Sequence, residues 1–290
     1  MVRSATDAPF RRRRRLRWYA GRAPVYAPLT FEALSIAFFA VLTVSAPWTP
    51  APRDRRRRAM LVFVAVAAVI AAVAYALPLS ARVWLGHAYL VAGYRLPALL
   101  VARIADPGSR IPDPGPFESW LIRTDERWFP LHATPPTWAA HILELSYLFC
   151  YVLVPAAFVF IWMNASTAHL DRFWTAVLLA GFACYGLLPW LVSPPPRARR
   201  TGSVDTAGGL RRLNLRILDR ASHGFNTFPS GHVAVSLAAA CAVLALSWPA
   251  GLVALVAAAA IAAGAVAGRY HYIIDVMAGA LIGVTACRLT

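Results

Sequence analysis

Long apolar stretches constrain the fold of this chain more than any other feature of its sequence. A helix needs about 20 mostly apolar residues to cross the hydrocarbon core of a bilayer. Hydrophobic residues make up 59% of the 290 residues and charged residues 14%, against about 25% charged residues in soluble domains. The sequence therefore predicts an all-α, polytopic transmembrane helix bundle with about six spans. The expected spans are residues 59–80, 138–163, 173–193, 230–248, 250–268 and 272–287.

A seventh apolar stretch, residues 31–46, is short for a span and contains Glu32. The chain has no lysine, and thirteen of its 29 basic residues are arginines in two clusters, at 3–22 and 53–58. A full crossing at 31–46 would place these clusters on opposite sides of the membrane. A re-entrant or interfacial hairpin keeps both at the cytoplasmic surface, where basic residues accumulate. We therefore expect a hairpin at 31–46.

This start determines the layout of the later spans. Residues 59–80 would run outward and residues 83–100 would lie at the outer interface. The loop 194–229, the start of the span at 230 and residues 268–275 would then share the outer surface. The loop holds seven arginines, which the positive-inside rule does not explain but phosphate binding would. The layout predicts a multi-pass protein of the cell membrane with its site on the extracytoplasmic face.

Three regions are expected along the chain: a disordered basic cytoplasmic tail at 1–28, N-terminal spans with an outer interfacial segment at 29–137, and a catalytic membrane core at 138–290. Basic clusters also typify nucleic-acid binding, but here they flank lipid-facing spans, so no nucleic-acid partner is expected. The four cysteines fall in apolar runs without CxxC spacing, which favours neither metal ligands nor disulfides. No metal or other cofactor is expected.

The stretch FPSGHVAVS, residues 228–236, opens an apolar run with residue types that packing does not explain. Proline suits the first turn of a helix. The backbone N–H groups of Ser230, Gly231 and His232 would then lie at a helix N-terminus, where the dipole and the unpaired donors favour an anion. Gly231 would let a ligand approach the backbone, Ser230 adds a hydroxyl donor, and His232 adds a titratable group.

A second polar group lies in the segment GRYHYIID. His271 and Asp275 are four residues apart, on one face of the helix expected there. The carboxylate can fix the imidazole tautomer and make the other ring nitrogen a better nucleophile. In SPPPRARR, the prolines would hold Arg197 near the outer end of a span for a bidentate grip on phosphate. Arg269 is a second candidate for this contact.

These motifs resemble a known superfamily. PSGH at 229–232, followed roughly forty residues later by His-x-x-x-Asp, is similar to the type 2 phosphatidic acid phosphatase superfamily. GLLPWLVSPPPR and RYHYIIDVMAG most resemble the branch that contains inositol phosphorylceramide synthase and its bacterial relatives. The resemblance covers roughly residues 138–287. It implies a membrane-embedded phosphoric ester hydrolase or inositol-phosphate-type phosphotransferase. Such an enzyme acts on a lipid or polyprenyl phosphate through a phosphohistidine, with water or a polyol or sugar as acceptor.

The resemblance also implies roles for single residues. Three would act in catalysis and four would bind phosphate: the nucleophile His271, its partner Asp275 and the general acid His232, then Arg197, Ser230, Gly231 and Arg269. The chain lacks the lysine usual in the first motif, and it has Ala265 where the third motif usually has an arginine. Positions 265 and 269 are one helical turn of about 5.4 Å apart, so we expect Arg269 to substitute.

Three further residues lie near the outer end of the span at 138–163: His141, Glu144 and, one turn on, Tyr147. Ionisable residues inside a span point to function, and these could orient the acceptor. A structural contact between His141 and Glu144 that closes the bundle is the alternative. The segment GGLRRLNLRILDR at 208–220 predicts an amphipathic helix in the interface over the site.

A non-enzymatic transporter or scaffold that retains the fold is the alternative to an enzyme. Transporters more often place charged residues at mid-membrane depth in broken helices. Here the charged residues gather at the ends of the expected spans.

Overall fold

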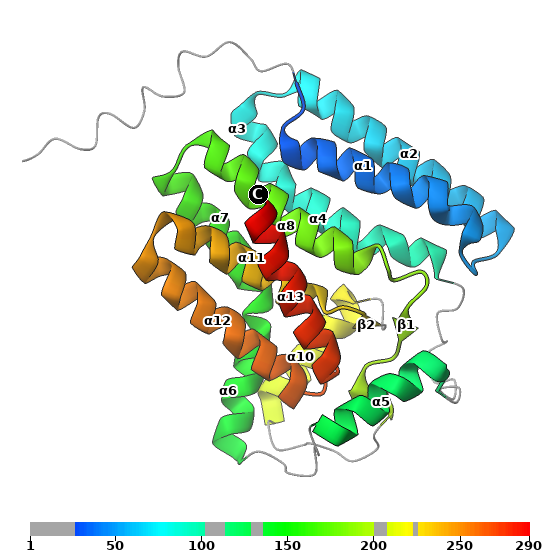
Figure 1. Cartoon of the computed structure of the whole chain (residues 1–290), viewed down its shortest axis with the longest axis vertical. Coiled ribbons are helices and arrows are strands. Elements are labelled where there is room, and N and C mark those ends of the chain that lie inside the picture. Colours follow the sequence, from blue (N-terminus) through cyan, green and yellow to red (C-terminus); the bar gives the residue numbers. More distant parts are fainter. Residues whose placement is uncertain (1–26, 102–113, 129–135, 200–207, 223–225) are drawn as a thin grey trace, which may run out of the picture.

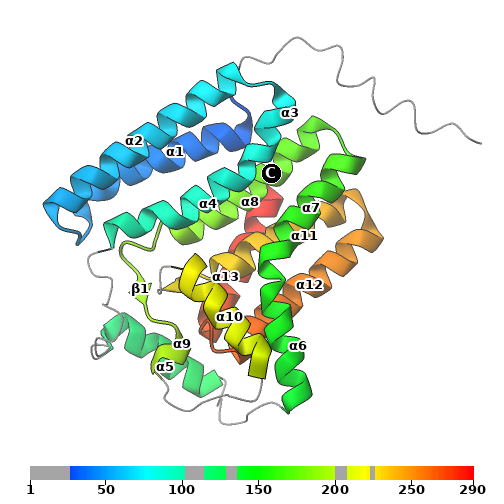
Figure 2. The same cartoon turned by 180° about the vertical axis from the view of Figure 1, so that it is seen from behind.

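The structure is a computed structural model, and it describes residues 27–101, 114–128, 136–199, 208–222 and 226–290. These residues are mostly helical (Figures 1 and 2). The tail expected at 1–28 lies almost entirely outside them. The longer helices are α1 (Thr30–Ser45), α2 (Arg53–Ala76), α4 (Gly86–Arg95), α5 (Pro116–Trp128), α6 (Thr137–Leu148), α7 (Cys150–Asn164), α8 (Thr167–Tyr185), α10 (Gly208–Ala221), α11 (Gly231–Leu246), α12 (Trp248–Ala267) and α13 (Ile273–Leu289). The short elements are η1 (Ala46–Trp48), α3 (Leu79–Arg82), η2 (Val83–Leu85), η3 (Leu96–Leu100), β1 (Val192–Ser193), α9 (Pro196–Arg199) and β2 (Asn226–Thr227).

The expected all-α membrane bundle is confirmed, and helices occupy each of the six expected spans. Among the described residues, the helices at Thr30–Trp48, α2 and α12 are each long and apolar enough to cross a membrane. The helices α6 and α7 pass the same test only together and are bent by 51° at the break between them, so the described residues hold three such helices, or four if this pair is one span. The strands β1 and β2 form a two-residue antiparallel ladder, which ties the segment after α8 to the segment before α11.

The helix α11 lies at the centre of the C-terminal bundle and packs against α7, α8, α12 and α13 (Figure 2). Its many alanines suit this place, since small side chains let helix backbones approach closely in a membrane. Its contact with α13 is closest at two glycines. A Cβ on Gly279 would lie 2.4 Å from the carbonyl oxygen of Ser230, and one on Gly283 would lie 2.5 Å from that of Ala234. These glycines therefore allow α13 to lie directly on α11.

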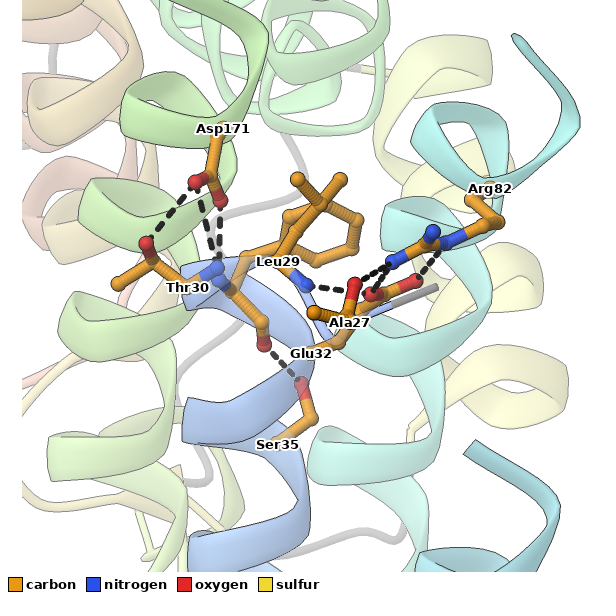
Figure 3. Close-up of polar contacts among 8 residues, drawn as sticks. Ala27, Leu29, Thr30, Glu32, Ser35, Arg82 and Asp171 are labelled. Atoms are coloured by element: carbon orange, nitrogen blue, oxygen red, sulfur yellow. Dashed lines mark hydrogen bonds and ion pairs between the residues drawn. The ribbon is translucent and has the colours of Figure 1, made fainter. Parts of the chain in front are cut away.

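The hairpin expected at 31–46 is wrong. These residues form the single helix α1, which lies beside α2 (Figure 1). The charge that argued against a span is paired. Arg82 Nε donates to Glu32 Oε1 over 2.9 Å, and both side chains are buried (Figure 3). The N–H of Leu29 also donates to Glu32 Oε2 over 2.7 Å. With its charge balanced by a buried guanidinium, Glu32 is compatible with a membrane helix.

A second carboxylate, Asp171 in the first turns of α8, caps the start of α1 (Figure 3). Asp171 accepts hydrogen bonds from Thr30 Oγ1 over 2.9 Å and from the N–H of Phe31 over 3.1 Å. Further along both helices, the ring of Phe38 stacks on that of Phe182 at 4.1 Å. The helices α1 and α8 therefore run parallel. The end of α1 and the start of α2 lie where α8 leads into β1.

This arrangement corrects the expected layout of the first spans. The arginine cluster at 53–58 begins α2 and lies at the end of the bundle that α8 reaches at its C-terminus. The helix α2 runs away from that end, whereas the expected layout has residues 59–80 run toward the end that holds the start of the span at 230 and residues 268–275. Arg55 Nη1 donates to the carbonyl of Val101 over 2.8 Å, and Arg56 Nε donates to that of Ala51 over 2.6 Å.

Residues 83–100, which were expected at the outer interface, form η2, α4 and η3, and α4 packs along α8. A Cβ on Gly86 would lie 2.3 Å from the indole ring of Trp174, and one on Gly93 would lie 2.3 Å from the ring of Phe182. The two glycines are thus required for this close approach. Since α4 follows α8 toward its C-terminal end, it brings Tyr94 to that end of the bundle.

Candidate active site

The PSGH segment forms the start of α11. Ser230 is the N-cap and Gly231 is the first helical residue. The Ser230 hydroxyl is fully buried and, among the described residues, has no hydrogen-bond partner. A Cβ on Gly231 would lie 2.1 Å from Cε1 of Tyr185. The glycine is therefore already required by the ring of Tyr185, in addition to any contact with a ligand.

His271 and Asp275 are in contact, but not on one helix face as expected. The helix α13 begins at Ile273, so His271 precedes it. His271 Nδ1 lies 3.4 Å from Asp275 Oδ2, and the same oxygen accepts the N–H of Tyr272 over 3.2 Å. The aspartate thus caps the helix and faces the imidazole at the same time.

The imidazole of His271 is held uncharged. Its backbone N–H donates to the carbonyl of Ala265 over 3.0 Å, and its side chain is 5% exposed. Burial, and secondly the nearby charge of Arg197, lower the pKa of His271 to about 3. At neutral pH the ring is therefore neutral. Because Nδ1 faces Asp275, Nε2 is the nitrogen left for attack on a substrate.

His232 lies next to His271. Their ring centroids are 6.1 Å apart and the ring planes are inclined at 80°. Both histidines and Asp275 thus share one end of the bundle, because α11 and α13 begin there together. This geometry gives a candidate nucleophile and a candidate acid on two different elements.

Arg197, in α9, lies beside His271. Its backbone N–H donates to the carbonyl of Arg269 over 3.1 Å, and its Cζ lies 5.2 Å from the ring centroid of Tyr270. Burial lowers the pKa of Arg197 from its ordinary value, but an arginine stays protonated at neutral pH. The site therefore has a partly buried positive charge close to the imidazole.

The spacing argument for Arg269 is wrong. The helix α12 ends at Ala267, and Arg269 has a φ of 57°, in the left-handed region. That conformation costs a residue other than glycine about 1–2 kcal/mol, and it turns the chain out of the helix. Positions 265 and 269 therefore do not share a helix face. Phosphate binding by Arg269 stays a prediction.

Glu144 is buried and bound to residues far away in sequence. Arg211 Nη1 donates to Glu144 Oε1 over 2.7 Å, while Asn214 Nδ2 and the hydroxyl of Tyr270 donate to Oε2. Asn214 Nδ2 also reaches the carbonyl of Glu144 over 2.9 Å. His141 instead has its Nδ1 2.7 Å from the carbonyl of Thr137 in its own helix. In place of the alternative contact between His141 and Glu144, the described residues show a link from Glu144 on α6 to α10.

Tyr270 connects this link to the histidines. Its ring stacks on that of Tyr147 at 4.0 Å and 10°, and the ring of Tyr147 lies 6.0 Å from that of His232. The guanidinium of Arg211 lies 5.9 Å from the Tyr270 ring centroid. The sequence indicated the helix α10 over the site but not Arg211 or Tyr270, because nothing local in the sequence marks Glu144 as their partner.

The helix α5 is another element that the sequence reasoning missed. Asp125 Oδ1 accepts the N–H of Ile273 over 2.6 Å at the start of α13, and the ring of Phe117 lies 5.2 Å from that of Phe228. The recurrence of apolar residues at intervals of three to four in PFESWLIRTDERW was the signal that could have revealed it. Across the described ranges, no group of three or more His, Cys, Asp or Glu side chains could hold a metal ion.

Comparison with protein families agrees with the motifs. The family model described as PAP2 superfamily matches residues 116–289, which is more than half of the chain. The chain therefore belongs to the PAP2 superfamily. The match begins at the first residue of α5 and so includes that helix. No curated protein and no solved structure gives a match. Membership supports a phosphatase-type function on lipid phosphates, in a protein surrounded by membrane lipids.

Proposed function

We propose that this protein is an integral membrane lipid phosphatase or phosphotransferase that works through a phosphohistidine on His271. The substrate would be a lipid or polyprenyl phosphate ester, and the acceptor would be water or a polyol or sugar. The observation that carries the proposal is the state of His271. It is buried and neutral, with Asp275 at Nδ1 and His232 at 6.1 Å, in a chain of the PAP2 superfamily.

The first step forms one bond and breaks one. Nε2 of His271 attacks phosphorus in line while the bond from phosphorus to the ester oxygen breaks. His232 gives its proton to the departing alkoxide, which leaves as an alcohol. Arg197, the start of α11 at Ser230 and Gly231, and Arg269 would bind the equatorial oxygens, where negative charge gathers.

In the second step, water or an acceptor alcohol takes the place of the alcohol that left, and the phosphoryl group is transferred to it. His232, now without its proton, accepts one from water or from an acceptor hydroxyl. That oxygen attacks phosphorus and the N–P bond breaks. His271 then returns to its neutral form. Asp275 stabilises the positive charge on the imidazole while the phosphorus is bound.

The segments GLLPWLVSPPPR and RYHYIIDVMAG support a place in the branch of inositol phosphorylceramide synthase. In that case the acceptor would be an alcohol and not water. Glu144 would hold Tyr270 and the helix α10 beside the site. Tyr147, stacked on Tyr270, would in turn help to position the ring of His232.

We also propose that the site faces the extracytoplasmic side of the cell membrane. The first helix usually sets the orientation, and the basic residues that flank it stay in the cytoplasm. Eight arginines within residues 3–22 precede α1, whereas five lie at 53–58, at the end of the bundle that holds the site. In cells that express a variant without the native cysteines, an impermeant maleimide should label Asp54→Cys and not Ser166→Cys. The reverse pattern would place the site in the cytoplasm.

Trapping the intermediate tests the function itself. The purified protein is mixed with ³²P-labelled phosphatidic acid or a labelled polyprenyl phosphate and quenched within one turnover. We expect a protein-bound label that is stable to alkali and labile to acid. His271→Gln should abolish it, while His169→Gln, at an exposed histidine at the other end of α8, should retain it. A label that survives in His271→Gln would refute the proposal.

A further inference from the structure

The rings of three tyrosines lie near that of His232 in the described structure. The ring centroid of His232 lies 5.9 Å from that of Tyr151, 6.0 Å from that of Tyr147 and 6.2 Å from that of Tyr94. These rings come from α7, α6 and α4. Tyr94 lies outside the residues that match the PAP2 superfamily. A part of the chain beyond the family match thus reaches the candidate general acid.

The three rings differ in how far they are already engaged. Tyr147 is buried and stacks on Tyr270, so its face is covered. Tyr151 is 38% exposed, and Tyr94 is partly exposed. Tyr94 is also held in place, because its ring packs edge to face on that of Tyr185 at 5.3 Å. Tyr94 and Tyr151 therefore keep accessible surface, and the rings of both lie within 6.2 Å of that of His232.

The geometry of the reaction indicates which part of the substrates would lie near Tyr94 and Tyr151. In an in-line displacement the departing or entering oxygen lies opposite the attacking nitrogen of His271. His232 exchanges a proton with that oxygen, so the rest of the alcohol lies on the His232 side. Both alcohols of the reaction use this place in turn. Tyr94 and Tyr151 are partly exposed tyrosines of the described structure whose rings lie near His232.

We propose that Tyr94 and Tyr151 form the subsite for the acceptor alcohol and that they favour a polyhydroxylated one. This rests on the function proposed above and names its acceptor class. A tyrosine offers an apolar ring face to C–H groups and a phenolic hydroxyl that can donate to and accept from alcohol groups. Two such rings suit the hydroxyl groups and C–H faces of a polyol or sugar.

The test separates formation of the phosphohistidine from its transfer. Wild-type protein, Tyr94→Phe, Tyr151→Phe and the double variant receive a labelled lipid phosphate and increasing myo-inositol, glucose or glycerol. Each assay measures the protein-bound label, the inorganic phosphate and the phosphorylated polyol. We expect an unchanged label and a ratio of phosphorylated polyol to inorganic phosphate that falls about fivefold or more, as loss of one or two hydrogen bonds implies. Tyr89→Phe, also on α4 but next to the buried Glu32, should match the wild type.

Each other result overturns the inference. An unchanged product ratio in the double variant would exclude a role in acceptor binding. A loss of the label in Tyr94→Phe or Tyr151→Phe would show that the rings support His232 and do not bind the acceptor. A wild type that forms the label but only inorganic phosphate would leave the phosphatase function standing without this subsite. A wild type without label would reject the proposed function, and the inference with it.

Discussion

The backbone N–H of Ser230 donates a hydrogen bond to the carbonyl of Asp275 over 3.0 Å. This bond joins the N-cap of α11 to the first turn of α13, and the close contacts at Gly279 and Gly283 continue the same packing along both helices. The two segments with the histidine motifs are therefore fixed to each other by main-chain contacts. The placement of His232 beside His271 follows from how the helices pack.

If His232 is the general acid, the decrease in rate when it is replaced should depend on the leaving group of the substrate. His232→Asn should lower kcat for a lipid phosphate by about 10²–10⁴-fold. The same variant should lose far less activity on p-nitrophenyl phosphate, because p-nitrophenolate departs without a proton. The ratio of the two losses, measured on one preparation, checks this. Equal losses on both substrates would assign His232 another role.

Glu144 should stabilise the protein mainly by balancing Arg211. Glu144→Gln leaves a largely buried guanidinium without its partner, and breaking such a pair costs about 3–5 kcal/mol. Replacing Arg211 as well, in Glu144→Gln/Arg211→Met, should restore part of the lost stability. Thermal unfolding of the two single variants and the double variant in detergent measures this coupling. Strictly additive effects would show that the pair contributes nothing.

The contact between α4 and α8 should tolerate no added methyl group. At Gly93 a Cβ would lie 2.3 Å from the ring of Phe182, so Gly93→Ala must displace that ring or separate the helices. We expect a loss of about 1–3 kcal/mol. Gly209→Ala is the matched control, because nothing lies within 4 Å of its Cβ position. Equal unfolding temperatures for both variants would contradict the packing described.

Stability should fall in acid because of His271. Its pKa is about 3 in the folded protein and near 6.5 when unfolded, so the unfolded chain binds the extra proton between these values. The contribution of His271 is complete above about pH 6.5 and decreases toward about pH 3, by up to about 1.4 kcal/mol per pH unit. The unfolding temperature of His271→Gln should decrease less between pH 6 and pH 4 than that of the wild type. Identical pH profiles would mean that His271 is not held neutral.

The sequence predicts the parts of this fold that depend on continuous apolar runs. The helices α2, α8, α11, α12 and α13 follow such runs. The helices α1 and α4 could not be placed this way, because each depends on a distant partner. Glu32 is acceptable in a span only beside Arg82, and α4 needs the rings of Trp174 and Phe182 opposite its glycines.

The candidate site shows the same division. The order of the motifs is enough to bring His232, His271 and Asp275 to one end of the bundle. The spacing argument for Arg269 failed because its left-handed turn follows the end of the helix that the spacing assumed to continue. The hydrogen-bond partners of Glu144 come from α10 and from the turn before α13. No local sequence pattern indicates a pairing between residues so far apart in the chain.

The docking of α1 and α4 on α8 also limits how the chain could be divided. A fragment that began at Pro116 would keep every residue of the superfamily match. It would also leave Asp171 without the start of α1, which it caps. The rings of Trp174 and Phe182, against which Gly86 and Gly93 pack, would be uncovered. The half of the chain that matches the superfamily is thus packed against α1 and α4, and residues 27–101 are as much a part of its architecture as the motifs themselves.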